Sequence, residues 1–402
     1  MLQHVGSKVP VYAAMFLMTM ALLIDSPALF YMATAMLATI GASRLQAYWS
    51  VRALRIERIA PPAVHVGQET TVSMIVWSER KIKRPLITIL DMLPARLRNS
   101  PRTPSLPIAP AFDQPVMTRY SFRPMRRGRY RWNEVSVKGT DTLGLQSTTK
   151  LYETEPAELI VYPTPIPINV DIRPSGGIGV SESESGQYRG AGIEPRGVRE
   201  YVPGDPQRYV HWASTARTGK IMVKEFEAGS GLTGWFFLQR KTGTEIGQGQ
   251  LTSFEVMCGH ARYLAEQFMR MGASVSFPTA ETRDPAADFQ DRLKQLDEVL
   301  TDIMPDSSVD LSVEINSVRS KIERGGTAYF HIVRQDPALP GVMSSFPDIN
   351  FVALVYDPKD YEANVPRDYA PATDPAYTRQ LEEAGAKVII VPGARWEADE
   401  TR

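Results

Sequence analysis

The residues best suited to bind or transform a ligand lie in the run 189–227, which is rich in basic side chains and in turns that contain glycine and proline. Guanidinium, ammonium and imidazole groups bind phosphates and carboxylates through charge-assisted hydrogen bonds. The run therefore predicts a site for an anion or an acidic peptide. Its candidate binding residues are Arg199, Arg208, His211, Arg217 and Lys220.

A turn and a short helix would position these side chains. The sequence Val-Pro-Gly-Asp at 202–205 favours a type II turn, because proline takes the second position and glycine the third. Asp205 followed by a proline is a typical helix start, so we expect a helix from residue 206 to about residue 217 that ends at Gly219. A strand over residues 221–226 follows.

The spacing along that helix leaves two interpretations open. Arg208, His211 and Trp212 would share one face of the helix and could form part of an anion site. Alternatively, Asp205 caps the helix and pairs with Arg199 or Arg208, and the run is a structural elbow between two domains.

Known catalytic and nucleotide-binding motifs are absent from the sequence. Lys220 follows Thr-Gly, but it lacks the Ser or Thr that comes after the lysine of a Walker phosphate loop. The histidines lack the H-E-x-x-H spacing of a zinc site, and no G-x-S-x-G nucleophile elbow occurs. We therefore expect no catalytic residue, metal or cofactor, and predict that the protein is not an enzyme.

The composition argues against a general role in nucleic-acid binding. Of the 402 residues, Lys and Arg contribute 45, and Asp and Glu also contribute 45, so there is no basic surplus to bind phosphates. Cys258 is the only cysteine, so no disulfide can form within the chain. The length is sufficient for two or three domains, each with its own core.

Residues 1–50 predict a membrane hairpin. Segments 9–24 and 28–42 carry no charge, and a turn that contains Asp25 separates them. As a helix each segment would be roughly 24 Å long, slightly shorter than a usual membrane span. Two buried helices of a soluble domain and a cleaved signal peptide are the alternatives.

Basic residues flank the predicted hairpin on both sides. Lys8 precedes it, and the turn between its helices holds no basic residue. Because positive residues stay on the cytoplasmic side of a membrane, we expect both ends of the hairpin, and the rest of the chain, to be cytoplasmic. The basic residues that follow the hairpin are Arg44, Arg52, Arg55 and Arg58.

Residues 51–165 predict a β-rich, sandwich-like domain, because short β-branched or apolar segments alternate with turn-rich ones such as 99–110. Residues 166–188 are rich in Pro, Gly and Ser and predict a flexible linker, and the elbow occupies 189–232. The predicted strands are 70–77, 86–91, 116–122, 130–137 and 159–162.

Residues 233–402 predict an α/β domain built on a doubly wound parallel sheet, because predicted strands alternate with predicted helices. The predicted strands are 235–238, 274–277, 327–333, 351–356 and 388–391, and the predicted helices are 254–271, 289–303, 313–323 and 377–384.

The elbow also carries a family resemblance. Its sequence RGVREYVPGDPQRYVHWASTAR, followed by KIMVKEFE, resembles the hallmark R-x-Y-x-P-G-D-x-x-R-x-I-x-W-x-x-x-A-R of the bacterial family called domain of unknown function 58. The order of anchor, β-rich domain, signature and α/β domain is also similar to that family. The matching residues are Arg199, Tyr201, Pro203, Gly204, Asp205, Arg208, Trp212, Ala216 and Arg217, with Val210 in place of isoleucine.

In that family the α/β domain resembles the von Willebrand factor A fold, in which a D-x-S-x-S motif after the first strand binds a divalent metal. Here the corresponding strand is followed by Gln239-Arg240-Lys241-Thr242-Gly243. Two cations at this position would repel a metal that needs oxygen ligands. The resemblance therefore implies a von Willebrand factor A-like domain that lacks its metal site.

The resemblance further implies an association with MoxR-type AAA+ ATPases, proposed chaperones that assemble or mature envelope or metal-containing complexes. We therefore expect a scaffold or adaptor, anchored in the bacterial inner membrane, that binds protein partners. Two alternatives stay open: an enzyme or anionic-ligand-binding protein that acts on envelope precursors, and an outward-facing adhesion receptor.

Overall fold

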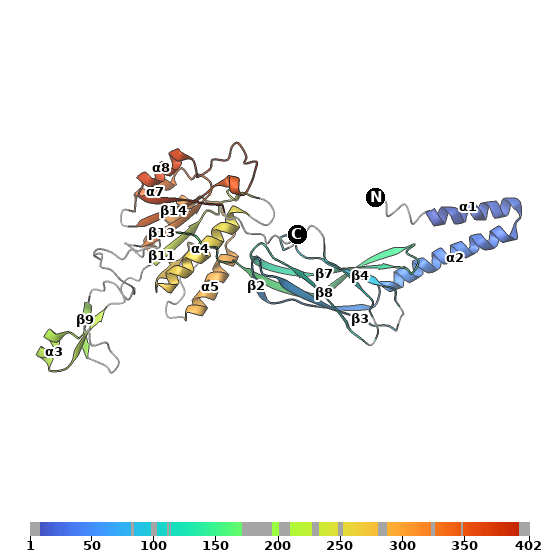
Figure 1. Cartoon of the computed structure of the whole chain (residues 1–402), viewed down its shortest axis with the longest axis horizontal. Coiled ribbons are helices and arrows are strands. Elements are labelled where there is room, and N and C mark those ends of the chain that lie inside the picture. The colour runs from blue at the N-terminus through green and yellow to red at the C-terminus, as the bar shows by residue number, and fades with distance from the viewer. Residues whose placement is uncertain are drawn as a thin grey trace. The chain divides into compact units, whose positions relative to one another are not determined.

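The computed structural model describes two compact units, Met1–Tyr162 and Pro163–Arg402 (Figure 1). The first contains a pair of helices and a β-rich domain, and the second contains a parallel α/β domain and the signature segment. The described residues are 9–81, 84–97, 103–110, 112, 114–170, 195–200, 210–226, 233–247, 252–279, 288–322, 326–346 and 349–393.

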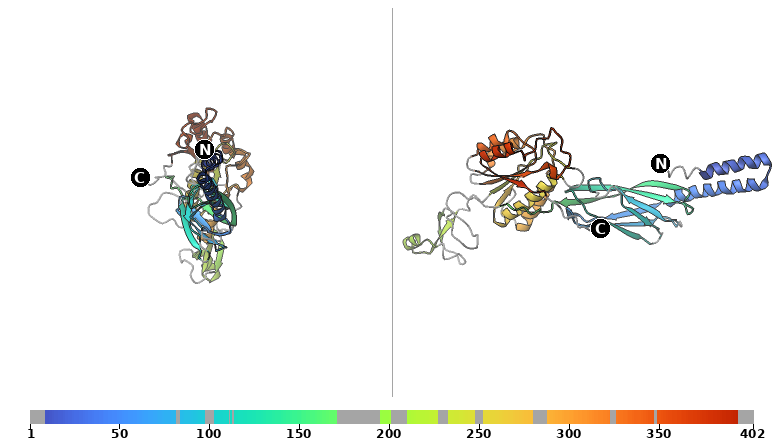
Figure 2. Two further views of the ribbon diagram at one scale, coloured as in Figure 1. Left: turned by 90° about the vertical axis from the view of Figure 1, so that its right-hand side faces the viewer. Right: turned by 45° about the horizontal axis from the view of Figure 1, so that its top comes forward.

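The N-terminal helices α1 (Val9–Ile24) and α2 (Pro27–Ser50) lie side by side (Figures 1 and 2). The bounds of α1 agree with the prediction, whereas α2 continues beyond the predicted end at residue 42, because its last part consists mostly of good helix formers. Within the described residues, α2 is long and apolar enough to cross a membrane, and α1 is a shorter apolar helix.

The β-rich domain consists of two sheets that share one core. In the first, β3 (Thr70–Ser78) lies between β1 (Leu54–Ile59) and β6 (Val116–Phe122), and all pairings are antiparallel. The second has the order β2 (Ala63–His65), β8 (Ser147–Tyr162), β7 (Gly128–Thr140), β4 (Ile87–Asp91) and β5 (Ser105–Ile108). Alternate residues of β3 and β4 are buried, as expected for strands with one face on the core.

The prediction of a β-rich domain is confirmed, and its strands at 70–77, 86–91 and 116–122 agree closely with β3, β4 and β6. The sequence analysis missed β1, β2 and β5. The last of these lies in the proline-rich stretch 99–110 and contains Pro107, a residue that strands tolerate at a sheet edge, where β5 lies.

The α/β domain has a five-stranded sheet, and all of its strand pairs are parallel. The order is β12 (Ser274–Ser276), β11 (Thr233–Leu238), β13 (Thr327–Ile332), β14 (Asn350–Tyr356) and β15 (Ala386–Val391). The central strands β13 and β14 are buried almost throughout, which fits a sheet covered on both faces. The prediction of a parallel α/β domain is confirmed.

Helices cover the two faces of this sheet through separate apolar clusters. The first cluster joins the sheet to α4 (Ser253–Arg270) and α5 (Phe289–Asp302). The second joins it to α6 (Leu311–Ser317), α7 (Leu339–Ser344) and α8 (Pro375–Glu383), with the short 3₁₀ turns η3 (Arg319–Lys321) and η4 (Pro358–Asp360) in the connections.

The first residues of the predicted linker belong to the α/β domain. Ile166 and Ile168 pack with Val170 against its core, and the backbone N–H of Ile166 donates to the carbonyl of Gly259 at 3.0 Å. A Cβ at Gly259 would lie only 2.5 Å from the side-chain Cδ1 of Ile166, so a larger residue would force this side chain to shift. Residues 171–188 lie outside the described residues.

The signature segment contains the antiparallel strands β9 (Pro195–Glu200) and β10 (Met222–Phe226) and the helix α3 (Trp212–Thr218). The predicted strand 221–226 agrees with β10, and Gly219 ends the helix in the left-handed conformation (φ 70°), as predicted. The predicted helix 206–217 is wrong over Val210 and His211, which are not helical: α3 begins at Trp212 with His211 as its N-cap, and residues 206–209 lie outside the described residues.

Candidate functional site

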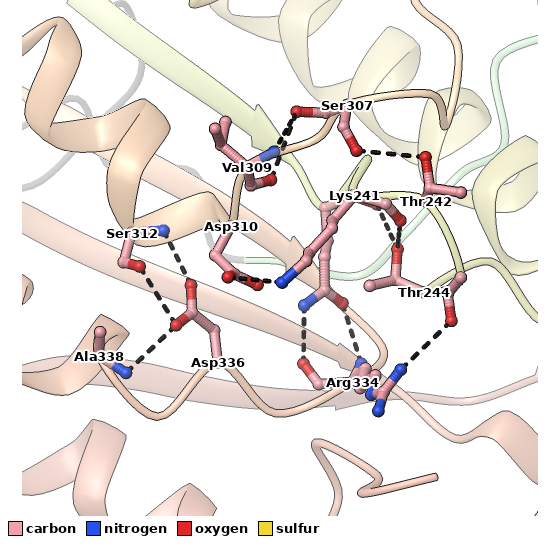
Figure 3. A network of polar contacts seen from close by, with 12 residues as sticks. Lys241, Thr242, Thr244, Ser307, Val309, Asp310, Ser312, Arg334, Asp336 and Ala338 are labelled. Atoms are coloured by element: carbon pink, nitrogen blue, oxygen red, sulfur yellow. Dashed lines mark hydrogen bonds and ion pairs between the residues drawn. The ribbon is translucent and has the colours of Figure 1, made fainter.

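A ligand site in this sheet is most expected at the carboxyl ends of β11 and β13. The chain leaves β11 towards β12 on one side and later returns as β13 on the other, so these neighbours mark a topological switch point. In open α/β sheets, ligands bind outside the carboxyl ends of the strands at such a point. We call the polar residues here the strand-end network, and Figure 3 shows the part of it around Lys241 and Asp336. Its main members are Gln239, Arg240, Lys241, Asp310, Glu314 and Asp336.

Gln239, the first residue after β11, is buried and turns its amide towards the loop that follows β13. Its Oε1 accepts hydrogen bonds from the backbone N–H groups of Val333 (3.0 Å) and Arg334 (2.9 Å), and its Nε2 donates to the carbonyl of Arg334 (2.8 Å). The side chain therefore ties the two strand ends together, which satisfies polar groups that burial would otherwise leave unpaired.

The next two residues are the cations that the sequence analysis singled out, and each has an acidic partner. Arg240 Nε donates to Glu314 Oε1 at 2.7 Å. Lys241 Nζ donates to Asp310 Oδ2, also at 2.7 Å (Figure 3). Burial raises the pKa of the Glu314 carboxyl, and the Arg240 guanidinium opposes that effect. Both cations are thus neutralised by carboxylates from the loop before α6 and from α6 itself.

The loop after β11 is also fixed by its backbone. Thr242 N donates to the carbonyl of Ser307 (2.9 Å), Ser307 N donates to the carbonyl of Arg240 (3.0 Å), and Thr244 Oγ1 donates to the carbonyl of Lys241 (2.7 Å). The hydroxyl of Tyr369 donates to the carbonyl of Thr244 at 2.7 Å. The loop is therefore well ordered before any ligand arrives.

Asp336 is a buried carboxylate near the end of β13, and backbone and side-chain donors surround it (Figure 3). Its Oδ2 accepts from Ser312 N (2.8 Å), and its Oδ1 accepts from Ser312 Oγ (3.2 Å) and from Ala338 N (3.1 Å). These bonds join the loop after β13 to the starts of α6 and α7, so Asp336 has a structural role.

The charged side chains of the strand-end network pair with one another, which leaves few polar groups to bind a ligand. Among the described residues, no group of three or more His, Cys, Asp or Glu side chains could hold a metal ion. A cation at this edge would also have to displace the ammonium of Lys241 or the guanidinium of Arg240 from its carboxylate. The expected lack of a metal site stays a prediction.

The structure describes part of the predicted anion site in the signature. Arg199 lies on β9, where its backbone pairs with Val223 of β10. His211 and Trp212 begin α3, Arg217 lies in its last turn, and Lys220 follows it. The predicted site residues that lie outside the described residues are Tyr201, Gly204, Asp205 and Arg208. The shared face of Arg208 and His211 therefore stays a prediction.

His211 has a local structural role at the start of α3. Its Nδ1 accepts from Ser214 N at 3.2 Å and lies 2.8 Å from Ser214 Oγ, so the imidazole caps the helix. Its backbone N–H donates to the carbonyl of Met222 at 2.8 Å, and Thr215 Oγ1 accepts from Met222 N at 3.0 Å. These contacts fasten α3 to β10.

Trp212 is the most unusual residue of α3, because its side chain is 73% exposed. No residue of this helix is buried, and only Ser214 and Thr215 are half-buried. Arg217 and Lys220 are exposed close by in the sequence. The helix therefore presents a large aromatic ring and basic side chains to its surroundings.

A second polar cluster, in the core of the α/β domain, was missed by the sequence analysis. The hydroxyl of Tyr356 lies 3.0 Å from His260 Nδ1 and 2.8 Å from His331 Nδ1, and His331 Nε2 has no hydrogen-bond partner. Burial lowers the pKa of His260 to about 4, and burial followed by the nearby His260 holds the pKa of His331 well below its ordinary value. Both imidazoles are therefore neutral at pH 7.

The signal for this cluster was a histidine inside an apolar run. His331 lies in β13, whose sequence TAYFHI is buried at every position. A polar side chain in a fully buried strand needs a partner, and the sequence could not show that the partner is Tyr356 of the neighbouring strand.

Comparison with known proteins identifies the signature segment. Residues 197–334 match the model of the family described as "Protein of unknown function DUF58", a range that runs from β9 to the loop after β13. This segment of the chain belongs to the DUF58 family. The match includes α3 and the strand-end residues from Gln239 to Arg334, whereas Asp336 of the strand-end network lies just beyond it.

The names of the similar proteins say little about the activity of this chain. The chain is 29% identical over 171 residues to "Uncharacterized protein YeaD" of Bacillus subtilis (strain 168), a similarity that covers 41% of this chain and only 42% of that protein. Among solved structures, the CARDB domain of PF1109 from Pyrococcus furiosus is 12% identical with a TM-score of 0.17, over 27% of this chain and 93% of that one. The β-glucosidase from Listeria innocua is 11% identical with a TM-score of 0.18, over 27% and 16%.

Proposed function

We propose that this DUF58 protein is a membrane-anchored, non-catalytic adaptor that binds protein partners through α3. In this proposal it works with a MoxR-type AAA+ ATPase in the assembly or maturation of envelope or metal-containing complexes. Within it, the β-rich domain is sandwich-like, and the α/β unit is a von Willebrand factor A-like domain in which Arg240 and Lys241 stand where a metal-binding relative has metal ligands.

The exposed ring of Trp212 is the observation that carries the proposal. Tryptophan and arginine contribute more binding energy at protein interfaces than most other residues, and exposing so large an apolar ring to water is unfavourable unless a partner covers it. The cap by His211 and the bonds to β10 hold the short helix in place, so the ring is presented on a preorganised surface.

The strand-end network supports the non-catalytic part of the proposal. Its amide, cationic and acidic side chains make hydrogen bonds to one another or to nearby backbone. A general base or nucleophile needs a side chain that is free to reach a substrate. A site whose polar groups are occupied in this way suits a rigid scaffold better than a reaction centre.

The apolar surface of α1 and α2 supports the anchor. Among the described residues, most of the large side chains exposed on these helices are apolar or aromatic, which suits contact with lipid acyl chains. The examples with the greatest exposure are Phe16, Leu22, Leu23, Tyr12 and Tyr31. We propose that the two helices form a hairpin in the bacterial inner membrane and that both soluble units are cytoplasmic.

Affinity capture of the full chain tests the proposal. The protein is solubilised from its native membrane and captured with ATP hydrolysis blocked, and the bound proteins are compared for wild type, Trp212→Ala and Val313→Ala. Val313 is a matched control, because it is 51% exposed on α6 of the same unit. We expect wild type and Val313→Ala to retain an AAA+ ATPase and Trp212→Ala to lose it. Equal recovery by all three proteins would refute a role of α3.

Reporter fusions test the orientation separately. A phosphatase that is active only outside the cytoplasm and a fluorescent protein that folds in the cytoplasm are fused in turn to the C-terminus. The basic residues that follow α2 predict that only the cytoplasmic reporter is active. Activity of the phosphatase would instead favour an outward-facing receptor.

A further inference from the structure

The turn between β7 and β8, residues 141–146, is attached to the last part of α2. The side-chain Oε1 of Gln46 accepts two hydrogen bonds from Thr142, one from its backbone N–H at 3.1 Å and one from its hydroxyl at 2.9 Å. Ser43, buried on α2 one turn earlier, also hydrogen-bonds the side chain of Asp141. The tip of a long hairpin is thus fixed beside a helix that is apolar enough to enter a membrane.

The turn itself is stiffened by Asp141. One carboxylate oxygen accepts from Gln146 N at 2.7 Å, the other accepts from Leu143 N at 3.2 Å, and Gly144 N donates to the carbonyl of Asp141 at 3.1 Å. Burial raises the pKa of the Asp141 carboxyl, but the bonds from Gln146, Ser43 and Leu143 outweigh it, so the pKa is lowered and the group is ionised. The turn keeps its shape without help from the side chain of Leu143.

Leu143 projects from this stiff turn with 63% of its side chain exposed. Leu45 on α2 is similarly exposed at 59%, close in sequence to Gln46, which holds the turn. Tyr48 and Trp49 follow within the next turn of α2, with the guanidinium of Arg52 4.0 Å from the Tyr48 ring centroid. Apolar and aromatic side chains from two different elements therefore gather near one end of α2.

In a membrane, the part of α2 around Gln46 would lie at the surface of the bilayer. The uncharged part of the helix, from Pro27 to Ser43, would be about 25 Å long, close to the hydrocarbon thickness of a membrane. Gln46 lies only about 3 Å further along the axis than Arg44, the first charge. Aromatic and basic side chains concentrate at this level in membrane proteins. Among the described residues, the exposed Arg44, Arg52 and Arg80 form no ion pair, so they remain available to lipid phosphates.

We propose that the turn 141–146 is a second membrane contact, in which Leu143 inserts into the boundary between headgroups and acyl chains of the bilayer that α2 enters. The inference rests on the proposed anchoring of α1 and α2. It adds that the β-rich domain touches the membrane directly, so that the turn and the helix together fix how this domain stands on the surface.

Depth-dependent fluorescence quenching tests this contact in the full chain. Single cysteines replace Leu143, Leu37 or Ile59, and each is labelled with an environment-sensitive fluorophore in vesicles of phosphatidylethanolamine and phosphatidylglycerol. Leu37 lies in the uncharged part of α2, and Ile59 is an exposed residue at the end of β1 away from α2. The native Cys258 is buried, so the unsubstituted chain controls for background labelling.

The quenchers are lipids with a nitroxide either at the headgroup or near the end of an acyl chain. We expect the probe at 143 to lose most of its emission to the headgroup quencher, the probe at 37 to respond to the acyl quencher, and the probe at 59 to respond to neither. Quenching at 37 without quenching at 143 would overturn the second contact and leave the anchor intact. No quenching at 37 would overturn both.

Discussion

Arg58 and Asp91 form an ion pair inside the β-rich domain, with 2.7 Å between Nη2 and Oδ1 and with side chains that are only 1% and 0% exposed. Arg58 comes from β1 of one sheet and Asp91 from β4 of the other, so the pair links the two sheets. Tyr120 donates its hydroxyl to the same carboxylate at 2.6 Å. Arg58, which the sequence analysis counted among the basic residues that orient the hairpin, is thus a buried partner in the core of this domain.

Replacing Arg58 should therefore destabilise the β-rich domain strongly. Arg58→Met would leave the Asp91 carboxylate buried without its counter-ion, and we expect a loss of about 3 to 5 kcal/mol in the free energy of unfolding. Urea denaturation of the full chain in detergent measures it. Arg55→Met is the matched control, because its pair with Glu57 is exposed, and it should cost less than about 1 kcal/mol. Similar losses for the two variants would contradict this account.

The two cations of the strand-end network should differ in the same way. Arg240 pairs with Glu314, whose side chain is nearly buried, whereas Lys241 pairs with the half-exposed Asp310. We expect Arg240→Ala to lower the free energy of unfolding by about 2 to 3 kcal/mol and Lys241→Ala to lower it by less than about 1 kcal/mol. Denaturation curves of the two variants measure these losses. A larger loss for Lys241→Ala would show that the burial of the acidic partner does not determine how much stability is lost.

Stability should also fall as the pH decreases through the range in which buried histidines resist protonation. The pKa of His260 is about 4 in the folded protein against an ordinary 6.5, so between these values the unfolded chain binds the extra proton. From pH 7 to pH 5, His260 alone should lower the free energy of unfolding by about 2 kcal/mol. His331 acts in the same direction.

The variant His260→Gln keeps an amide near the Tyr356 hydroxyl but cannot take up a proton. Its loss of stability between pH 7 and pH 5, followed by denaturation at each pH, should be clearly smaller than that of the wild type. Parallel curves for the two proteins would mean that His260 does not titrate as described.

The absence of a metal is a further expectation that can be measured. Because Arg240 and Lys241 occupy the carboxylates at the strand ends, we expect Mg²⁺ and Mn²⁺ to leave the melting temperature of the α/β domain unchanged and to show no saturable binding in calorimetry. Dialysis against EDTA beforehand removes any metal already bound. Saturable binding that raises the melting temperature would contradict the proposal that this α/β domain lacks a metal site.

Local patterns in the sequence were sufficient to predict most of the elements. The uncharged run of α1, the β-branched segment of β3 and the alternation of strand and helix after residue 233 each carry their own signal. The strand β1 was missed because its sequence LRIERI is half charged, and one of those charges, Arg58, is satisfied by the distant Asp91.

The candidate sites were harder to predict, because their partners are far apart in the chain. The pair of Lys241 and Asp310 joins residues 69 positions apart, and Gln239 bonds a loop about 95 positions away. The cap of α3 is local, but the Asp-Pro at 205–206 gave a stronger start signal than His211, a residue type not typical of N-caps. No local pattern could show that Trp212 is exposed.

The central claim, that α3 is the surface that binds an AAA+ ATPase, is tested most directly by site-specific photo-crosslinking. A photoreactive amino acid is placed at position 212 or, as a control, at position 313, in the full chain in its native membrane. We predict that light links position 212, and not position 313, to an AAA+ ATPase under conditions that block ATP hydrolysis. Crosslinks to the ATPase from 313 alone, or none from 212, would contradict the account.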